Sequence, residues 1–138
     1  MREYAYPHCF GCGTQNPQGL HLQNTYVDGK ACISFTVDEY HTGYPGLLHG
    51  GVTCTLLDEA MFYAVLALDV ETVTTEMTVR YLKPAKLGHS LICEAWVEFR
   101  EGRRIEAHAI IRDQAEGTRI AEAQGKYLEV DLARLLQK

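Results

Sequence analysis

The residues best suited to chemistry lie in one apolar segment in the first half of the chain. His49, Gly50 and Gly51 open this segment, and the acidic pair Asp58 and Glu59 interrupts it within its first turns. Glycines at a helix start leave backbone N–H groups accessible, and a buried carboxylate is costly unless it is paired or used. The pattern therefore indicates an acid/base residue near a helix end that can bind an oxyanion. Two such groups together can promote attack on an activated carbonyl.

A second group with chemical potential is the Cys9-x-x-Cys12 pair, which His8 precedes. A structural zinc site usually takes four ligands in two spaced pairs, and the sequence has no second close pair, although His21 or another copy of the chain could contribute. A redox pair would be expected beside a βαβ unit, and none is predicted. A packed glycine-rich turn is the favoured interpretation, with zinc and redox chemistry as alternatives, and we predict neither a metal nor a cofactor.

The first half of the chain must position these residues. Residues 1–19 are a turn-rich segment, and two extended runs at 20–27 and 31–37 flank Asp28-Gly29, a strong hairpin signal. After a loop, apolar residues recur at helical spacing from about Gly50 to Leu68. This helix is apolar over much of its circumference, so another element must wrap around it.

The second half reads as antiparallel strands. Residues 72–82 alternate, with odd positions from Val73 to Tyr81 on one face and even positions from Thr74 to Arg80 on the other. Further strands precede and follow turns at Glu101-Gly102 and Glu116-Gly117, and the last ten residues form a charged tail or short helix. We predict one α+β domain spanning 1–138, in which a curved antiparallel sheet of five to six strands wraps one long central helix.

Composition narrows the functional classes. The chain has 138 residues and a net charge of −5 without a dense basic run, which argues against nucleic-acid binding. No apolar stretch approaches the roughly 20 residues that span a bilayer, and the N-terminus lacks a secretory signal. Five cysteines, three of them in apolar segments, fit free thiols in a reducing cytoplasm. We therefore expect a cytoplasmic protein that binds neither nucleic acid nor membrane.

Several motifs stand in the order and spacing of a known family. They are Gly46, His49-Gly50-Gly51, Asp58 nine positions after the histidine, Tyr81-Leu82-Lys83-Pro84-Ala85-Lys86-Leu87-Gly88, and Cys9-Phe10-Gly11-Cys12-Gly13 with Asn16-Pro17-Gln18-Gly19-Leu20. Over residues 8–128 the chain resembles the hotdog-fold acyl-CoA thioesterases, in the phenylacetyl-CoA-thioesterase-like branch. The resemblance implies a hotdog fold, hydrolysis of acyl-CoA thioesters, and at least a homodimer with active sites between two subunits.

The resemblance also implies residue roles. Asp58 corresponds to the family's carboxylate, which acts as base or nucleophile, and the backbone N–H of Gly51 corresponds to the oxyanion donor. Thr74 corresponds to the residue that positions the attacking water, and His49 to the histidine near the thioester. These four residues are the expected catalytic group.

The remaining expected site residues bind substrate. They are Gly50, Gly43, Glu59, Thr75 and Lys83, of which Lys83 could meet the phosphates of coenzyme A. Gly43 stands where related enzymes often have an asparagine that helps to hold the substrate. That departure favours an alternative function, a non-catalytic module that binds acyl-CoA or an aromatic ligand on the same fold, whereas the retained Asp58 disfavours it. A hydratase or dehydratase is a weaker alternative, since no matching acid–histidine motif is found.

Overall fold

The computed structural model describes residues 6–137, which form six strands and two α-helices. In chain order they are β1 (Asn24–Val27), β2 (Lys30–Thr36), the 3-10 turn η1 (Glu39–His41), α1 (Gly50–Leu66), β3 (Thr72–Tyr81), β4 (Ser90–Glu101), β5 (Arg104–Asp113), β6 (Arg119–Glu129) and α2 (Leu132–Leu136). The strands make one antiparallel sheet in the order β1-β2-β4-β5-β6-β3.

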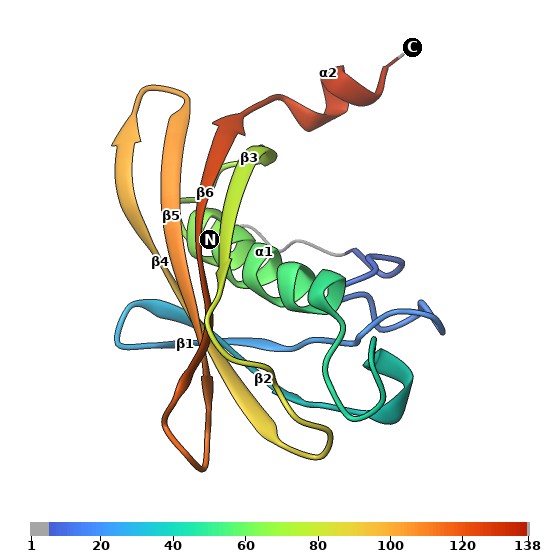
Figure 1. The fold of residues 1–138 in the computed structure, drawn as a ribbon. Coiled ribbons are helices and arrows are strands. Elements are labelled where there is room, and N and C mark those ends of the chain that lie inside the picture. Colours follow the sequence, from blue (N-terminus) through green and yellow to red (C-terminus); the bar gives the residue numbers. More distant parts are fainter. Residues whose placement is uncertain (1–5, 138) are drawn as a thin grey trace.

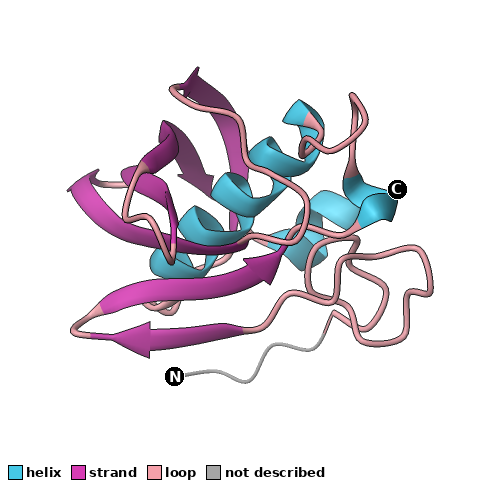
Figure 2. Ribbon diagram, turned by 60° about the horizontal axis from the view of Figure 1, so that its bottom comes forward, coloured by secondary structure: helices cyan, strands magenta, loops and turns pink. Residues whose placement is uncertain are grey.

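The sheet curves around α1, as the apolar circumference of this helix requires (Figure 1). Figure 2 shows α1 along the concave side of the strands, with the N-terminal loops to one side. The inward residues of α1 are buried against those of β2, β4, β5 and β6. The predicted architecture, one long helix wrapped by a curved antiparallel sheet, is confirmed, and β1 and β3 are its two edges.

Two predicted boundaries are wrong by a few residues. The first strand begins at Asn24, because the chain before it is bonded to the N-terminal loop instead: the Leu20 N–H donates to Phe10 O at 2.9 Å and the Leu22 N–H donates to Gly11 O at 2.8 Å. Helix α1 ends two residues early, since Asp69 adopts a positive φ of 61° that a continuing helix does not allow.

The predicted alternation along β3 is also wrong, because a β-bulge lies between Thr74 and Glu76. The even-numbered Thr74 hydrogen-bonds to α1 through its side chain. The odd-numbered Met77, Val79 and Tyr81 face the same helix, although strict alternation would put them on the opposite side. The extra residue of the bulge moves the inward face from even to odd positions. Residues that strict alternation places on opposite faces therefore meet the same helix.

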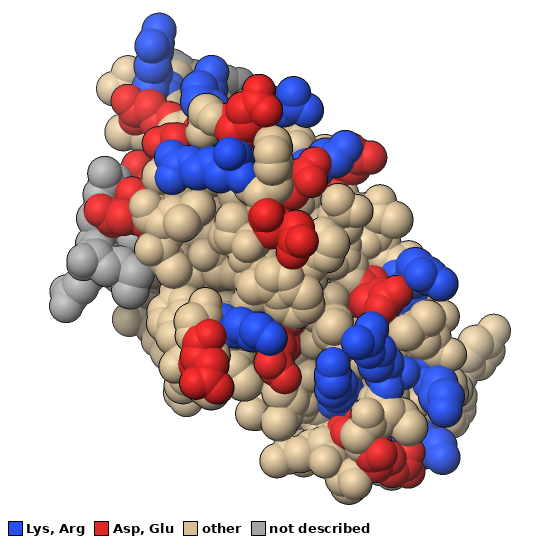
Figure 3. Space-filling view, turned by 90° about the vertical axis from the view of Figure 1, so that its left-hand side faces the viewer, with Lys and Arg blue, Asp and Glu red and all other residues tan. Residues whose placement is uncertain are grey.

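Charged residues of both signs are interspersed on the side of the molecule that Figure 3 shows. Within residues 6–137, no helix has both the length and the apolar character needed to cross a bilayer.

Candidate active site

A carboxylate held by two hydroxyl groups lies in the middle of α1. Asp58 Oδ1 accepts a hydrogen bond from the Tyr127 hydroxyl at 2.9 Å and another from Thr74 Oγ1 at 3.1 Å. Tyr127 is 2% exposed, and its burial and the nearby Asp58 charge raise its pKa far above the ordinary value. Tyr127 therefore stays protonated and donates to Asp58, and the two bonds fix one carboxylate oxygen while leaving the other without a protein donor among the described residues.

The strand register explains why these hydroxyls converge. Thr74 on β3 is the cross-strand partner of Tyr127 on β6, so both side chains lie on the same face, toward α1. The β-bulge follows directly, and Thr75, the extra residue, donates its hydroxyl to Lys126 O at 3.1 Å. Bulges of this kind often occur beside active sites because they redirect a side chain.

A cavity of about 550 Å³ opens beside the carboxylate. Its walls come from α1, β3, the N-terminal segment and α2, and its lining residues include Tyr6, Cys9, Asp58, Phe62, Thr74 and Leu132. A cavity with apolar walls and a few fixed polar groups suits a small organic ligand.

The second group of interest is the N-terminus of α1, where His49 caps the helix. Its Nδ1 accepts from the Gly51 N–H at 2.8 Å, and its carbonyl oxygen accepts from the N–H groups of Val52 and Thr53 at 3.0 and 3.1 Å. Within residues 6–137 the N–H of Gly50 has no hydrogen-bond acceptor. The open donor at this helix end is therefore Gly50, whereas the N–H of the predicted donor Gly51 is bonded within the chain.

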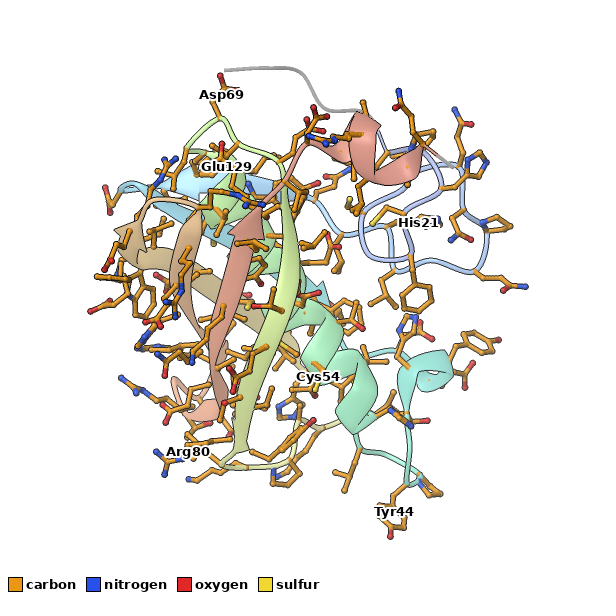
Figure 4. All side chains as sticks on the ribbon, turned by 90° about the horizontal axis from the view of Figure 1, so that it is seen from above. His21, Tyr44, Cys54, Asp69, Arg80 and Glu129 are labelled. Atoms are coloured by element: carbon orange, nitrogen blue, oxygen red, sulfur yellow. The ribbon has the colours of Figure 1, made fainter. Side chains whose placement is uncertain are left out.

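A cavity of about 410 Å³ adjoins this helix end, with Gly43, Tyr44, Leu48, His49 and Gly50 among its lining residues. A Cβ on Gly43 would lie 3.4 Å from the His49 ring, so Gly43 lies directly against the cap. Tyr44 projects from the same loop and is 82% exposed (Figure 4).

Tyr81 anchors this end of α1 to β3. Its hydroxyl donates to Gly50 O at 2.9 Å. The same oxygen lies 3.0 Å from the Sγ atom of Cys54, a residue of α1 that Figure 4 labels. The Gly50 carbonyl is thereby held, which fixes the direction of the peptide units at the helix start.

The two groups do not meet within one chain. Gly50 and Asp58 are eight residues apart on α1, which corresponds to about 12 Å along the helix axis. An acid and an amide that act on one carbonyl must both lie within a few ångströms of it. Within one chain, Gly50 and Asp58 therefore cannot act on the same carbonyl.

Of the two other predicted substrate-binding residues, Lys83 lies apart from both groups, whereas Glu59 lines the cavity beside Asp58. Lys83, in the β3–β4 connection, is exposed and lines a shallow cavity with Lys86 and His89. Glu59 turns toward the N-terminal loop, where its Oε1 accepts from Cys9 Sγ at 3.5 Å, and burial raises its pKa.

Sequence reasoning missed Tyr127 as a site residue. The signal was its place at the end of the small-residue face Ala121, Ala123 and Gly125, where a tyrosine in a buried position needs a partner for its hydroxyl. The identity of that partner depends on the β3–β6 register, which one sequence does not display.

One long helix wrapped by a six-stranded antiparallel sheet is the architecture of the hotdog class of proteins. The comparisons agree. The family model of the thioesterase superfamily matches residues 45–120. Acyl-coenzyme A thioesterase 13 of Homo sapiens is 32% identical over 99 residues, covering 70% of each chain.

Solved structures share the fold. A thioesterase superfamily protein of 25% identity superimposes with a TM-score of 0.82, covering 89% of this chain and 61% of that one. The PaaI protein of E. coli, from the phenylacetic acid degradation operon, is 24% identical with a TM-score of 0.76 and 81% of each chain covered. The chain belongs to the thioesterase superfamily.

Proposed function

We propose that this protein hydrolyses acyl-CoA thioesters to a free acid and coenzyme A. The observation that carries the proposal is the Asp58 carboxylate, fixed by Tyr127 and Thr74 beside a cavity of about 550 Å³. The relatives named as acyl-coenzyme A thioesterases support the substrate class.

In this proposal Asp58 acts either as a general base or as a nucleophile. As a base it removes a proton from water, whose oxygen adds to the thioester carbon, and the coenzyme A thiolate leaves and takes up a proton. As a nucleophile it forms a mixed anhydride that water then hydrolyses. In both routes Tyr127 and Thr74 hold one Asp58 oxygen, so the other oxygen is directed at the reaction.

The thioester oxygen gains negative charge in either route, and a helix N-terminus stabilises such charge through its oriented N–H groups. The unbonded N–H of Gly50 suits this role without rearrangement. The predicted donor, Gly51, would first have to give up its bond to His49 Nδ1, which protonation of that ring or a turn of its side chain would allow.

The distance of about 12 Å between Gly50 and Asp58 favours a site completed by a second copy of the chain. Edge strand β3 carries Thr74 next to Asp58, and its outer edge has no strand partner within residues 6–137. Pairing of β3 with its copy would bring the helix N-terminus of one chain toward Asp58 of the other. We further propose that the protein self-associates and acts in the cytoplasm, without a nucleic-acid or membrane partner.

The proposal is tested by thiol release from short, long and aromatic acyl-CoA substrates. Wild-type protein should turn over at least one of these classes, and Asp58→Asn should lose about a hundredfold in kcat, because the base or nucleophile is gone. Turnover that is equal in both proteins would remove Asp58 from the mechanism. Tight binding of acyl-CoA without turnover would instead support the non-catalytic module.

The shared site is tested by mixing two inactive variants. Gly50→Pro removes the open N–H at a helix position where proline is well tolerated, and Gly50→Ala, whose Cβ would lie 3.5 Å from Tyr81, keeps it as the control. If the site spans two copies, Gly50→Pro mixed with Asp58→Asn should regain about a quarter of wild-type activity, since half of the dimers hold one intact site of two. No recovery after verified subunit exchange would contradict a shared site.

A further inference from the structure

A cluster of metal-ligating side chains lies on the face of α1 next to the Asp58 face. Atoms of Cys9, Cys12 and Glu59 all lie within 4.8 Å of one another, although the cysteines and the glutamate are about fifty positions apart in sequence. Cys9 Sγ is 3.5 Å from Glu59 Oε1. The sequence suggested His8 or His21 as companions of the two cysteines, whereas the fold brings Glu59 to them.

One atom of this cluster has no partner. Glu59 Oε2 is buried and makes no hydrogen bond within residues 6–137. A buried carboxylate oxygen without a donor is destabilising, and such groups in native structures often mark a position for a water or an ion. A cation bound at the cluster would give Glu59 Oε2 the partner that it lacks among the described residues.

The loop that carries the cysteines packs closely around Glu59. A Cβ on Gly11 would lie 2.3 Å from Glu59 Cδ, and one on Gly13 would lie 2.5 Å from the Cys9 backbone nitrogen. Gly13 must be glycine because its neighbours are backbone atoms, whereas a side chain at position 11 would force the Glu59 side chain to move. The backbone is thereby brought close enough to place both thiols at the carboxylate.

The two sulfur atoms lie in a partly buried loop, and burial raises the pKa of Cys12 to about 12, so a bound cation would have to displace its proton. The Cys12 N–H donates to Cys9 Sγ at 3.5 Å. Donors to sulfur from groups that are not themselves ligands orient the ligands of a metal and stabilise their charged form.

We propose that Cys9 Sγ, Cys12 Sγ and the Glu59 carboxylate bind a zinc ion, with water as the fourth ligand. Zn–S and Zn–O bonds of about 2.3 and 2.0 Å at a tetrahedral angle place sulfur and oxygen about 3.5 Å apart, which matches the Cys9–Glu59 separation. Thiolates favour zinc over calcium or magnesium, which prefer all-oxygen ligands. Binding releases the two thiol protons to solvent.

The proposed ion would join the N-terminal loop to α1 at the wall of the Asp58 cavity, because Cys9 and Glu59 both line that cavity. Its role is to fix this wall, and the metal is not required for the thioester chemistry assigned to Asp58. The zinc proposal and the proposed hydrolase function can therefore fail independently.

The test measures metal binding directly, on the full-length protein. The protein is reduced, stripped of metal, incubated with zinc and passed through a desalting column, and elemental analysis should find about one zinc per chain. Cobalt(II) in place of zinc should give a sulfur-to-cobalt charge-transfer band and the intense visible bands of tetrahedral coordination. Cys9→Ser, Cys12→Ser and Glu59→Gln should each weaken binding at least about tenfold.

Cys32→Ser, which removes a thiol outside the cluster, is the matched control and should bind zinc as the wild type does. No retained zinc, a cobalt spectrum without the charge-transfer band, or binding unchanged in Cys9→Ser and Cys12→Ser would each overturn the proposal. Because the cobalt spectrum is recorded on wild-type protein, the test stands even if a variant fails to fold.

Discussion

Two adjacent carboxylates on α1 lie in different surroundings. Asp58 faces the hydroxyls of Tyr127 and Thr74, whereas Glu59 faces the thiols of Cys9 and Cys12. Successive residues of an α-helix point about 100° apart, so one step in sequence moves a carboxylate from the sheet side to the N-terminal loop side. The partners of each acid, rather than its place in a motif, therefore decide what it can do.

The largest effect is expected when each acid of α1 is neutralised in turn. Asp58→Asn should lower kcat about a hundredfold, while Glu59→Gln should keep kcat within about threefold and lose zinc. The measurement is steady-state thiol release alongside elemental analysis of the same samples. A larger kcat loss in Glu59→Gln than in Asp58→Asn would reverse the assignment of the two acids.

The next largest effect should come from removing the buried hydroxyl that holds Asp58. Tyr127→Phe should lower kcat about tenfold, because a hydrogen bond to a charged group contributes about 1.5–3 kcal/mol. Tyr26→Phe is the control, since the Tyr26 hydroxyl donates to Tyr63 O at 2.8 Å and does not contact Asp58. Equal activities of the two variants would show that Tyr127 does not position the carboxylate.

Removing the exposed hydroxyl should have a smaller effect. Thr74→Val keeps the side-chain shape but loses the donor, and we expect a loss of about threefold to tenfold in kcat, because water competes for this exposed bond to Asp58. Thr74→Ser restores the hydroxyl and should return activity to near the wild-type value. Failure of serine to rescue would indicate that Thr74 acts through packing.

The smallest effect on activity is expected at a third carboxylate, remote from both acids of α1. Asp113 Oδ2 lies 2.6 Å from His89 Nδ1, and this bond, with backbone donors from Glu116 and Ala115, lowers the pKa of Asp113. A lowered pKa stabilises the fold above the ordinary pKa of an aspartate, and this stabilisation is lost as the pH falls below about 4.

Thermal unfolding between neutral and acid pH measures this effect. Asp113→Asn should be less stable than wild type at neutral pH, and the difference should shrink as the pH falls, while kcat at neutral pH stays unchanged. A difference in Tm that is constant with pH would show that the ionised carboxylate of Asp113 does not contribute to stability.

Much of this arrangement could be predicted from local pattern. The apolar circumference of the 50–68 segment required a wrapping sheet, and the Asp28-Gly29 turn and the alternating strands supplied one. The position of Asp58 on the helix followed from the same periodicity. These features are local because helix and strand periods act over neighbouring residues.

Tertiary structure alone decided which groups meet. The bulge after Thr74 moved the inward face of β3, and the β3–β6 register placed Tyr127 at Asp58. Such pairings depend on contacts between residues distant in sequence, and a one-residue change in register reverses every side chain of a strand. The sequence by itself determined the fold class and the acid on the helix, whereas only the packing of distant segments determined the partners that give each acid its chemistry.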